Sequence, residues 1–277
     1  TKYNLDDYQG AASELEKAVS MGANRYETFA NLGNAKFRME NYREAIANYD
    51  KAIASGKADA LLYNNRGKAK LNLQDYKGSL SDFDKSLELN PGNDKAIENR
   101  AEARYQPQDW KGSMADVEKL IAGGRSDVGF YQKTGTAKFA LKDYEGASKA
   151  LSVVVEKRIK DKDVFRMLGL SYAQLGNCVE AQNNLSAAVS MGATDKDVYS
   201  RLGICQYNSK DYKGSIESLT KEINAGANTK DVFLYKGYAG YLQKDYDNAL
   251  KDLENSVSLG AKEAEAHKYI ADIKFLK

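Results

Sequence analysis

The chain has 277 residues, of which 42% are hydrophobic and 29% charged, a composition typical of globular proteins. Its net charge of +2 leaves no positive excess to hold a phosphate backbone, so we expect no nucleic-acid partner. With one His and two Cys, the chain has little for metal ligation or acid–base catalysis, so we expect no enzyme, metal or cofactor. No apolar run approaches the roughly 20 residues of a transmembrane helix, so we expect no direct membrane insertion. Cytoplasmic and periplasmic locations both stay open.

The sequence repeats with a period of 34 residues from end to end. One column of the repeat holds only Gly or Ala, at Gly33, Gly67, Ala101, Gly135, Gly169, Gly203, Gly237 and Ala271. Another column is aromatic except for one Cys, at Tyr8, Tyr42, Tyr76, Trp110, Tyr144, Cys178, Tyr212 and Tyr246. Small and bulky positions therefore recur in fixed phase, which indicates one structural unit repeated along the chain.

The phase of these columns sets the repeat boundaries. Residues 1–24 form a partial repeat with only its second helix, and residues 263–277 form a terminal helix. Complete repeats lie between them at 25–58, 59–92, 93–126, 127–160, 161–194, 195–228 and 229–262. With two prolines and no Gly/Ser-rich linker, we expect one continuous array over 1–277, read as a segment of a longer repeat protein. The alternative is that the last helix is a natural cap.

Each complete repeat predicts two amphipathic helices in succession. In residues 25–58, apolar side chains fall at three- and four-residue spacings on both sides of Asn41. Asn or Asp opens the second helix of every repeat, where its side chain is suited to cap free N–H groups, at Asn41, Asp75, Asp109, Asp143, Asn177, Asp211 and Asp245. Glycine ends most second helices, at Gly22, Gly56, Gly124, Gly192, Gly226 and Gly260. The predicted fold class is therefore all-α.

Charged residues recur in pairs sixteen positions apart. In three repeats a basic residue directly precedes the small column and an aspartate follows it in the second helix: Arg66 with Asp82, Arg100 with Asp116, and Lys236 with Asp252. The other complete repeats carry no charge at either position. We therefore predict structural salt bridges between the two helices of these three repeats, and expect loss of one partner to cost more than loss of both.

These features resemble the tetratricopeptide repeat family, whose units are 34-residue helix–turn–helix pairs. Phe29, Leu32 and Gly33 with Tyr42 and Ala45 match the family pattern, and the resemblance covers the whole chain. It implies a right-handed superhelical solenoid of antiparallel helix pairs. First helices would line a concave groove that binds segments of other proteins.

The exposed side of the first helices supplies the candidate groove. Its first half is polar, with Asn34, Asn65, Lys68, Lys95, Asn99 and Lys133, side chains that can hydrogen-bond a peptide or a carboxylate. Its second half is more apolar, with Arg166, Leu170, Arg201, Ile204, Leu234 and Tyr238, a composition typical of interface anchors. The alternative is that some of these side chains pack against the next repeat.

Other candidate sites have weaker signals. Asn34, Asn65 and Lys95 match a clamp that some family members use for acidic chaperone C-termini, but Ala30 and Asn99 depart from it. Cys178 and Cys205 are expected to be small core residues rather than a disulfide, and His267 a packed or half-exposed ring.

The leading interpretation is a non-enzymatic scaffold or adaptor that binds a protein or peptide. The alternative is a recognition or assembly arm of a larger enzyme or of a secretion or envelope complex. A third possibility is weak self-association through the truncated ends, where Leu15 and Val19 would be exposed.

Overall fold

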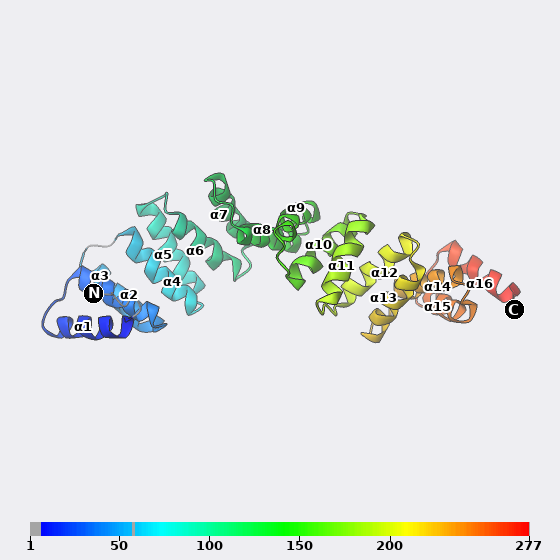
Figure 1. Ribbon diagram of the computed structural model, residues 1–277, viewed down its shortest axis with the longest axis horizontal. Coiled ribbons are helices and arrows are strands. Elements are labelled where there is room, and N and C mark those ends of the chain that lie inside the picture. Colours follow the sequence, from blue (N-terminus) through cyan, green and yellow to red (C-terminus); the bar gives the residue numbers. More distant parts are fainter. Residues whose placement is uncertain (1–6, 57–58, 277) are drawn as a thin grey trace. The chain divides into compact units, whose positions relative to one another are not determined.

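A computed structural model describes residues 7–56 and 59–276 of the chain (Figure 1). Within these residues it contains sixteen α-helices and no β-strand. The helices are α1 (Tyr8–Ser20), α2 (Tyr26–Arg38), α3 (Tyr42–Ala54), α4 (Ala60–Asn72), α5 (Tyr76–Leu89), α6 (Asp94–Tyr105), α7 (Trp110–Ala122), α8 (Val128–Ala140), α9 (Tyr144–Glu156), α10 (Lys162–Gln174), α11 (Cys178–Ser190), α12 (Lys196–Asn208), α13 (Tyr212–Asn224), α14 (Lys230–Leu242), α15 (Tyr246–Ser258) and α16 (Ala264–Leu276). Each predicted complete repeat contains one pair of helices.

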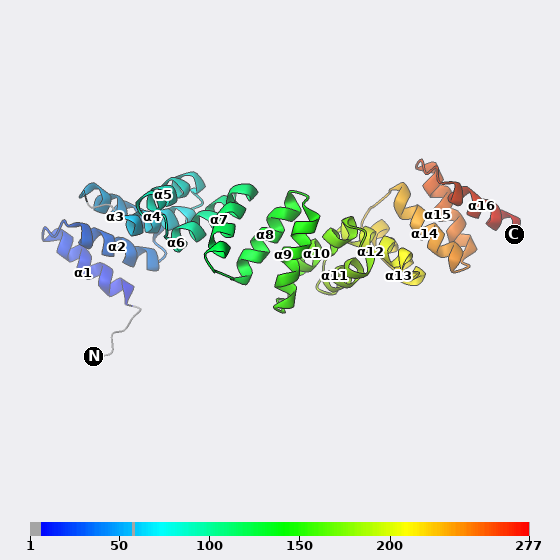
Figure 2. The ribbon, with the colours of Figure 1, turned by 90° about the horizontal axis from the view of Figure 1, so that it is seen from above.

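The chain divides into two units, residues 1–126 with α1–α7 and residues 127–277 with α8–α16. The division coincides with a predicted repeat boundary. Within each unit, consecutive helices pack as antiparallel pairs that stack on one another (Figure 2). The predicted all-α class of stacked helix pairs is therefore confirmed within each unit. One continuous array and its right-handed superhelical sense stay predictions.

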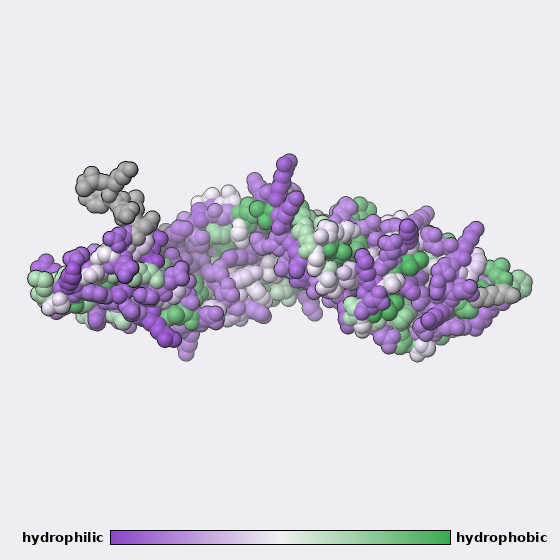
Figure 3. Space-filling model, turned by 60° about the horizontal axis from the view of Figure 1, so that its bottom comes forward, coloured by the Kyte–Doolittle hydropathy of each residue, from purple (hydrophilic) through white to green (hydrophobic). Residues whose placement is uncertain are grey.

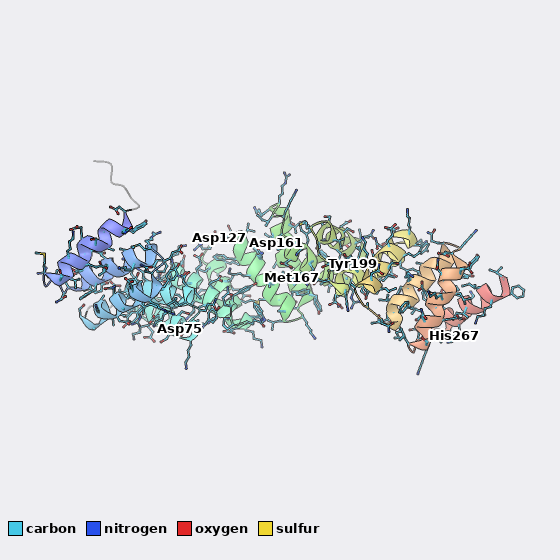
Figure 4. All side chains as sticks on the ribbon, turned by 90° about the horizontal axis from the view of Figure 1, so that it is seen from below. Asp75, Asp127, Asp161, Met167, Tyr199 and His267 are labelled. Atoms are coloured by element: carbon cyan, nitrogen blue, oxygen red, sulfur yellow. The ribbon has the colours of Figure 1, made fainter. Side chains whose placement is uncertain are left out.

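In each pair, the second helix begins directly after the predicted Asn or Asp. The side chain of Asp75 accepts a hydrogen bond from the backbone N–H of Gly78 at 2.9 Å, as Asp109, Asp143 and Asp211 do from their own glycines (Figure 4 labels Asp75). The expectation of a capping residue in every repeat is wrong for Asn41, Asn177 and Asp245, whose side chains make no cap bond.

The residue three positions after the cap explains this difference. At the start of second helices it is glycine wherever the cap bond forms, and a Cβ built on Gly78 would lie 2.1 Å from an Asp75 carboxylate oxygen. Glu44, Glu180 and Asn248 occupy the same position in the three repeats without the bond. Their Cβ atoms take the space that the capping carboxylate needs.

The predicted glycine stops are present at the ends of second helices. Gly22, Gly56, Gly124, Gly192, Gly226 and Gly260 all have φ between 86° and 97°, a left-handed conformation that costs glycine little. Repeat 127–160 places Arg158 at this position with φ 59°. A non-glycine residue in this conformation is strained by the contact of its Cβ with the backbone.

The small column lies where the two helices of a pair cross. A Cβ on Gly33 would lie 2.5 Å from the ring of Tyr49, and one on Gly169 would lie 2.9 Å from the backbone nitrogen of Leu185. The facing side chains Tyr49 and Leu185 are fully buried. Close backbone approach with a large side chain filling the remaining space holds each pair together.

No helix in the described part of the chain is long and apolar enough to cross a bilayer.

Candidate functional site

In the first unit, two of the predicted salt bridges belong to larger networks of charged side chains. We call each network, which joins three helices, an ionic ladder. Arg66 on α4 donates from Nε to Asp82 on α5 at 2.9 Å and from Nη1 to Asp50 on α3 at 2.7 Å. Lys70 adds a 2.8 Å contact to Oδ2 of Asp82, the oxygen that also accepts from Arg66 Nε, and the side chain of Asp82 is buried. One guanidinium therefore joins both helices of its repeat to the preceding repeat.

The following repeat, 93–126, contains the same arrangement of charged side chains. Arg100 on α6 bonds Asp116 on α7 at 3.0 Å and Asp84 on α5 at 2.7 Å, and Arg104 supplies the second cation to Asp116 at 2.8 Å. Burial alone would lower the pKa of Arg100, but the hydrogen bonds that it donates to both aspartates reverse this and raise the pKa. The arginine stays charged because its carboxylates replace water.

The third predicted pair lies in the second unit and is simpler. Lys236 on α14 contacts Asp252 on α15 at 2.7 Å. Thr220 stands where the ladders of the first unit have Asp50 or Asp84, so this pair has no equivalent link to the preceding repeat. Burial raises the pKa of Asp252, although Lys236 acts in the opposite direction.

The candidate binding site of the first unit is a pocket of about 360 Å³ between α2 and α4. It brings together three of the predicted groove residues, and its lining consists of Asn34, Phe37, Arg38, Tyr49, Asn65 and Lys68. Among the described residues that line it, none is acidic. The pocket is therefore a concave site with two cations and two amides.

Hydrogen bonds orient the amide of Asn34 in this pocket. Its oxygen accepts from the hydroxyl of Tyr49 at 2.9 Å and from the amide of Asn65 at 3.0 Å. Burial raises the pKa of Tyr49, so that hydroxyl stays protonated and remains a donor. Because both interactions use the oxygen of Asn34, its NH₂ group is left to donate to a ligand.

The two cations of the pocket lie over aromatic rings. Lys68 Nζ is 5.4 Å from the ring centroid of Phe37, and the guanidinium carbon of Arg38 is 5.8 Å from that of Tyr8. These cation–π contacts hold the side chains without neutralising them. The pocket thus offers hydrogen-bond donors and positive charge.

The other predicted groove residues of the first unit lie apart from the pocket. Lys95 is exposed and pairs with Glu98 at 3.0 Å, while Asn99 donates to the buried Asn64 at 2.8 Å. Of the three residues that match the acidic-terminus clamp, Asn34 and Asn65 are hydrogen-bonded in the pocket, whereas Lys95 does not line it and pairs with a carboxylate.

Most of the predicted apolar groove of the second unit is buried. Leu170, Leu234 and Tyr238 are 8%, 4% and 6% exposed. Leu170 packs with Leu202 and other residues of α11 and α12, while Leu234 and Tyr238 pack in a cluster that includes Ile273. The expectation that these three side chains are exposed anchors is therefore corrected, because each is covered by the next first helix.

The remaining groove candidates of the second unit are half-buried. They are Lys133 on α8, Arg166 on α10, and Arg201 and Ile204 on α12. Arg166 approaches Asp163 of its own helix at 3.4 Å. In the view of Figure 3, hydrophilic side chains cover most of the visible surface of both units and hydrophobic ones form separate patches.

A tyrosine cluster occupies the C-terminal part of the second unit, and we define it as Tyr207, Tyr235, Tyr238, Tyr241 and Tyr269. The rings of Tyr207 and Tyr235 are 5.4 Å apart, those of Tyr238 and Tyr269 are 5.4 Å apart, and those of Tyr241 and Tyr269 stack at 3.9 Å. All except Tyr238 are half-buried. First helices α12, α14 and α16 therefore share a partly exposed aromatic surface.

The cysteines and the histidine carry no site. Cys178 and Cys205 are free thiols in one core region, as expected of packing residues. Burial raises the pKa of Cys205 to about 12, with a further contribution from its hydrogen bond to Cys178. His267 is exposed on α16 (Figure 4), although a packed or half-exposed ring was expected.

Comparison with known proteins finds the same family of repeats in both units. A family model described as tetratricopeptide repeat matches residues 31–94 in the first unit and 166–231 in the second. Residues 31–94 and 166–231 are therefore tetratricopeptide repeats. No curated protein matches the sequence significantly.

Solved structures with low sequence identity have a similar fold. A tetratricopeptide repeat protein from Parabacteroides merdae ATCC 43184 is 15% identical, with a TM-score of 0.53, over 90% of this chain and 98% of its own. A structure of MamA AMB-1 is also 15% identical, with a TM-score of 0.54, over 61% of this chain and 93% of its own. At this identity the likeness concerns the fold alone.

Several residues of the two surfaces escaped the sequence analysis. Phe37 and Tyr49 belong to the apolar spacing of residues 25–58 that predicts helix packing, yet both line the pocket. Tyr235 and Tyr269 lie one repeat period apart, and this spacing was the signal that could have revealed the aromatic surface of the second unit.

Proposed function

We propose that this protein is a non-enzymatic scaffold that binds an extended acidic segment of another protein in the pocket between α2 and α4. The observation that carries the proposal is the chemistry of the pocket lining. Lys68, Arg38 and the NH₂ group of Asn34 are donors, and no carboxylate lies among the described lining residues. The tetratricopeptide repeat fold supports an interaction role rather than catalysis, because its repeats present side chains for recognition.

The geometry favours a peptide over a small molecule. The pocket is open along the surface between two first helices, and its amides can pair with the carbonyl groups of an extended backbone. A carboxylate side chain on that backbone would meet Lys68 and Arg38, where charge-assisted hydrogen bonds are stronger than neutral ones. Aromatic carbon of Phe37 supplies apolar contact beside the charges.

The test is fluorescence anisotropy with three labelled octapeptides, made of alternating Gly and Glu, Gly and Lys, or Gly and Gln. We expect the Glu peptide to bind best, with an affinity that falls as salt rises. The variant Lys68→Met removes the charge but keeps a side chain over Phe37. It should weaken binding of the Glu peptide about tenfold or more, because a hydrogen bond to a charged group contributes about 1.5–3 kcal/mol.

Lys111→Met is the matched control, because Lys111 is an exposed lysine of α7 in the same unit and its loss changes net charge equally. It should leave binding unchanged. Equal weakening by both variants would show that the peptide senses only net charge. A Glu peptide that binds no better than the Lys peptide would rule out the proposed acidic partner.

A further inference from the structure

The tyrosine cluster faces carboxylates. Tyr269 donates its hydroxyl to Glu265 at 2.7 Å, and Tyr241 donates to Asp272 at 3.2 Å. Both acceptors are on α16. Because these bonds engage the hydroxyl groups, the faces of the rings are the part of the cluster that a ligand can use.

The charges that act on the cluster are negative. Burial raises the pKa of Tyr238 to about 12, with further contributions from Glu265 and Glu263. Burial followed by Glu265 likewise raises the pKa of Tyr207. Glu263 also pairs with Lys230 at 3.2 Å, whereas Glu265 is exposed and accepts the hydrogen bond from Tyr269 of the cluster. A negative potential thus coincides with the electron-rich faces of several rings.

Elsewhere in the chain, such ring faces hold the protein's own cations. Lys51 lies over Phe29, Arg66 over Tyr63, Lys68 over Phe37 and Lys221 over Tyr199, at 5.4 to 5.9 Å from each ring centroid. Within residues 7–56 and 59–276, no such contact falls on a ring of the tyrosine cluster. The cluster therefore has the ring faces and the carboxylates of a cation site, but no cation from the described residues lies over its rings.

We propose that the tyrosine cluster, with Glu265 and Asp272, binds an arginine-bearing segment of a partner protein. A guanidinium stacks on a tyrosine face and donates to a carboxylate at the same time, which a lysine ammonium does less well. The negative potential disfavours nucleic acid and acidic peptides. This site is chemically opposite to the donor-rich pocket between α2 and α4 and lies in the other unit, so the two proposals stand independently.

The experiment is anisotropy titration of the whole chain with a labelled, end-blocked peptide of four Gly-Arg repeats. Matched peptides of four Gly-Lys and four Gly-Glu repeats are titrated in parallel. We expect the order Arg, then Lys, with the Glu peptide not binding here. Glu265→Gln keeps an acceptor for Tyr269 while removing the charge, and it should weaken Arg-peptide binding about three- to tenfold.

Asp163→Asn is the matched control. Asp163 occupies the same repeat position on α10 as Glu265 does on α16, but the tyrosine cluster lies away from it on α12, α14 and α16. It should leave binding unchanged, as should Lys68→Met in the other unit. Tyr269→Leu should weaken binding with unchanged helicity by circular dichroism.

Three results would overturn the proposal. The first is no binding of the Arg peptide, or binding no tighter than that of the Lys peptide. The second is equal weakening by Asp163→Asn and Glu265→Gln. The third is concentration-dependent sedimentation of the free chain that Glu265→Gln abolishes, because the cluster would then be occupied by a second copy.

Discussion

The two units solve the same packing problem with different chemistry. In the first unit, two complete repeats join their helices through buried aspartates, Asp82 and Asp116, each held by two cations. In the second unit, repeats 161–194 and 195–228 place Leu168 and Leu202 where those repeats have arginine. The backbone arrangement is the same, so the period of 34 residues and the small column determine the helix pair, while the filling between the helices can be ionic or apolar.

The difference has consequences for how each unit responds to change. A buried ion pair gains little net stability over a well-packed apolar pair, but it becomes costly when one partner is lost. An apolar pair loses stability through cavities or overpacking instead. We therefore expect the repeats with buried ion pairs, 59–92 and 93–126, to be sensitive to charge, and the apolar repeats 161–194 and 195–228 to be sensitive to volume.

The largest expected effect comes from breaking one ladder. Asp82→Ala leaves Arg66 and Lys70 partly buried beside a cavity, and should lower the free energy of unfolding by about 3–5 kcal/mol. The double variant Arg66→Leu with Asp82→Asn installs the Leu168 and Asn184 combination of the second unit. It should cost less than the single variant in urea denaturation. If the double variant were as unstable as the single one, the Leu and Asn pair of the second unit would not be able to replace the ion pair of the first.

The repeat position of Ser86 in the first unit holds Glu222 in the second, and we expect this glutamate to make the stability of the second unit depend on pH. Ser86 in the first unit donates to the carbonyl of Ala60 at 2.7 Å, whereas the equivalent Glu222 in the second unit is 5% exposed, with Oε2 unpartnered. Burial raises the pKa of Glu222 to about 7, although a hydrogen bond with Ser200 acts in the opposite direction. The charged groups that act on it are Asp197, Arg201 and Lys196 of α12.

The direction of this pH effect on stability follows from the difference between the pKa values of Glu222 in the folded and unfolded chain. Between its ordinary pKa of 4.5 and about 7, Glu222 is ionised in the unfolded chain but protonated in the folded one. Stability should therefore fall by about 3 kcal/mol as pH rises through this window, and stay level above it. Thermal unfolding from pH 4 to 8 measures this, and Glu222→Gln should remove that part of the slope. An unchanged slope in the variant would assign the pH dependence to other groups.

Substitutions in the small column measure how strongly the stability of each repeat depends on side-chain volume. In Gly67→Ala the new methyl would meet only the ring of Phe83, at 2.7 Å, whereas in Gly169→Ala it would meet both the side chain and the backbone nitrogen of Leu185. Both should destabilise by about 1–3 kcal/mol, with the larger loss at Gly169 because α11 itself must move. Denaturation midpoints compare them. A larger loss at Gly67 would contradict this ranking.

The smallest expected effect concerns the helix caps. Asp109→Ala removes a carboxylate that accepts from Gly112, and should cost about 1 kcal/mol. Asn177→Ala removes a side chain with no cap bond, and should cost little. Comparable losses from both would show that the hydrogen bond is not what stabilises these turns.

Much of the fold follows from short-range pattern. Gly33 and Tyr42 mark a crossing and a helix start wherever the period repeats them, and the pairing of Arg66 with Asp82 is visible as two charges that occur together or not at all. The surfaces were harder to predict. Leu170 and Tyr238 look like exposed anchors on a single helix, but the following first helix covers them.

The sequence by itself therefore determined the all-α class, the helix pairs, the glycine stops and the partners of the three salt bridges, because these depend on spacing within one repeat. Only the tertiary structure decided which first-helix side chains stay exposed, which caps bind and which donors meet in the pocket between α2 and α4. Those features depend on contacts between repeats and on the space around individual atoms. A residue such as Asn34 acquires its orientation only from Tyr49 and Asn65, which other helices bring to it.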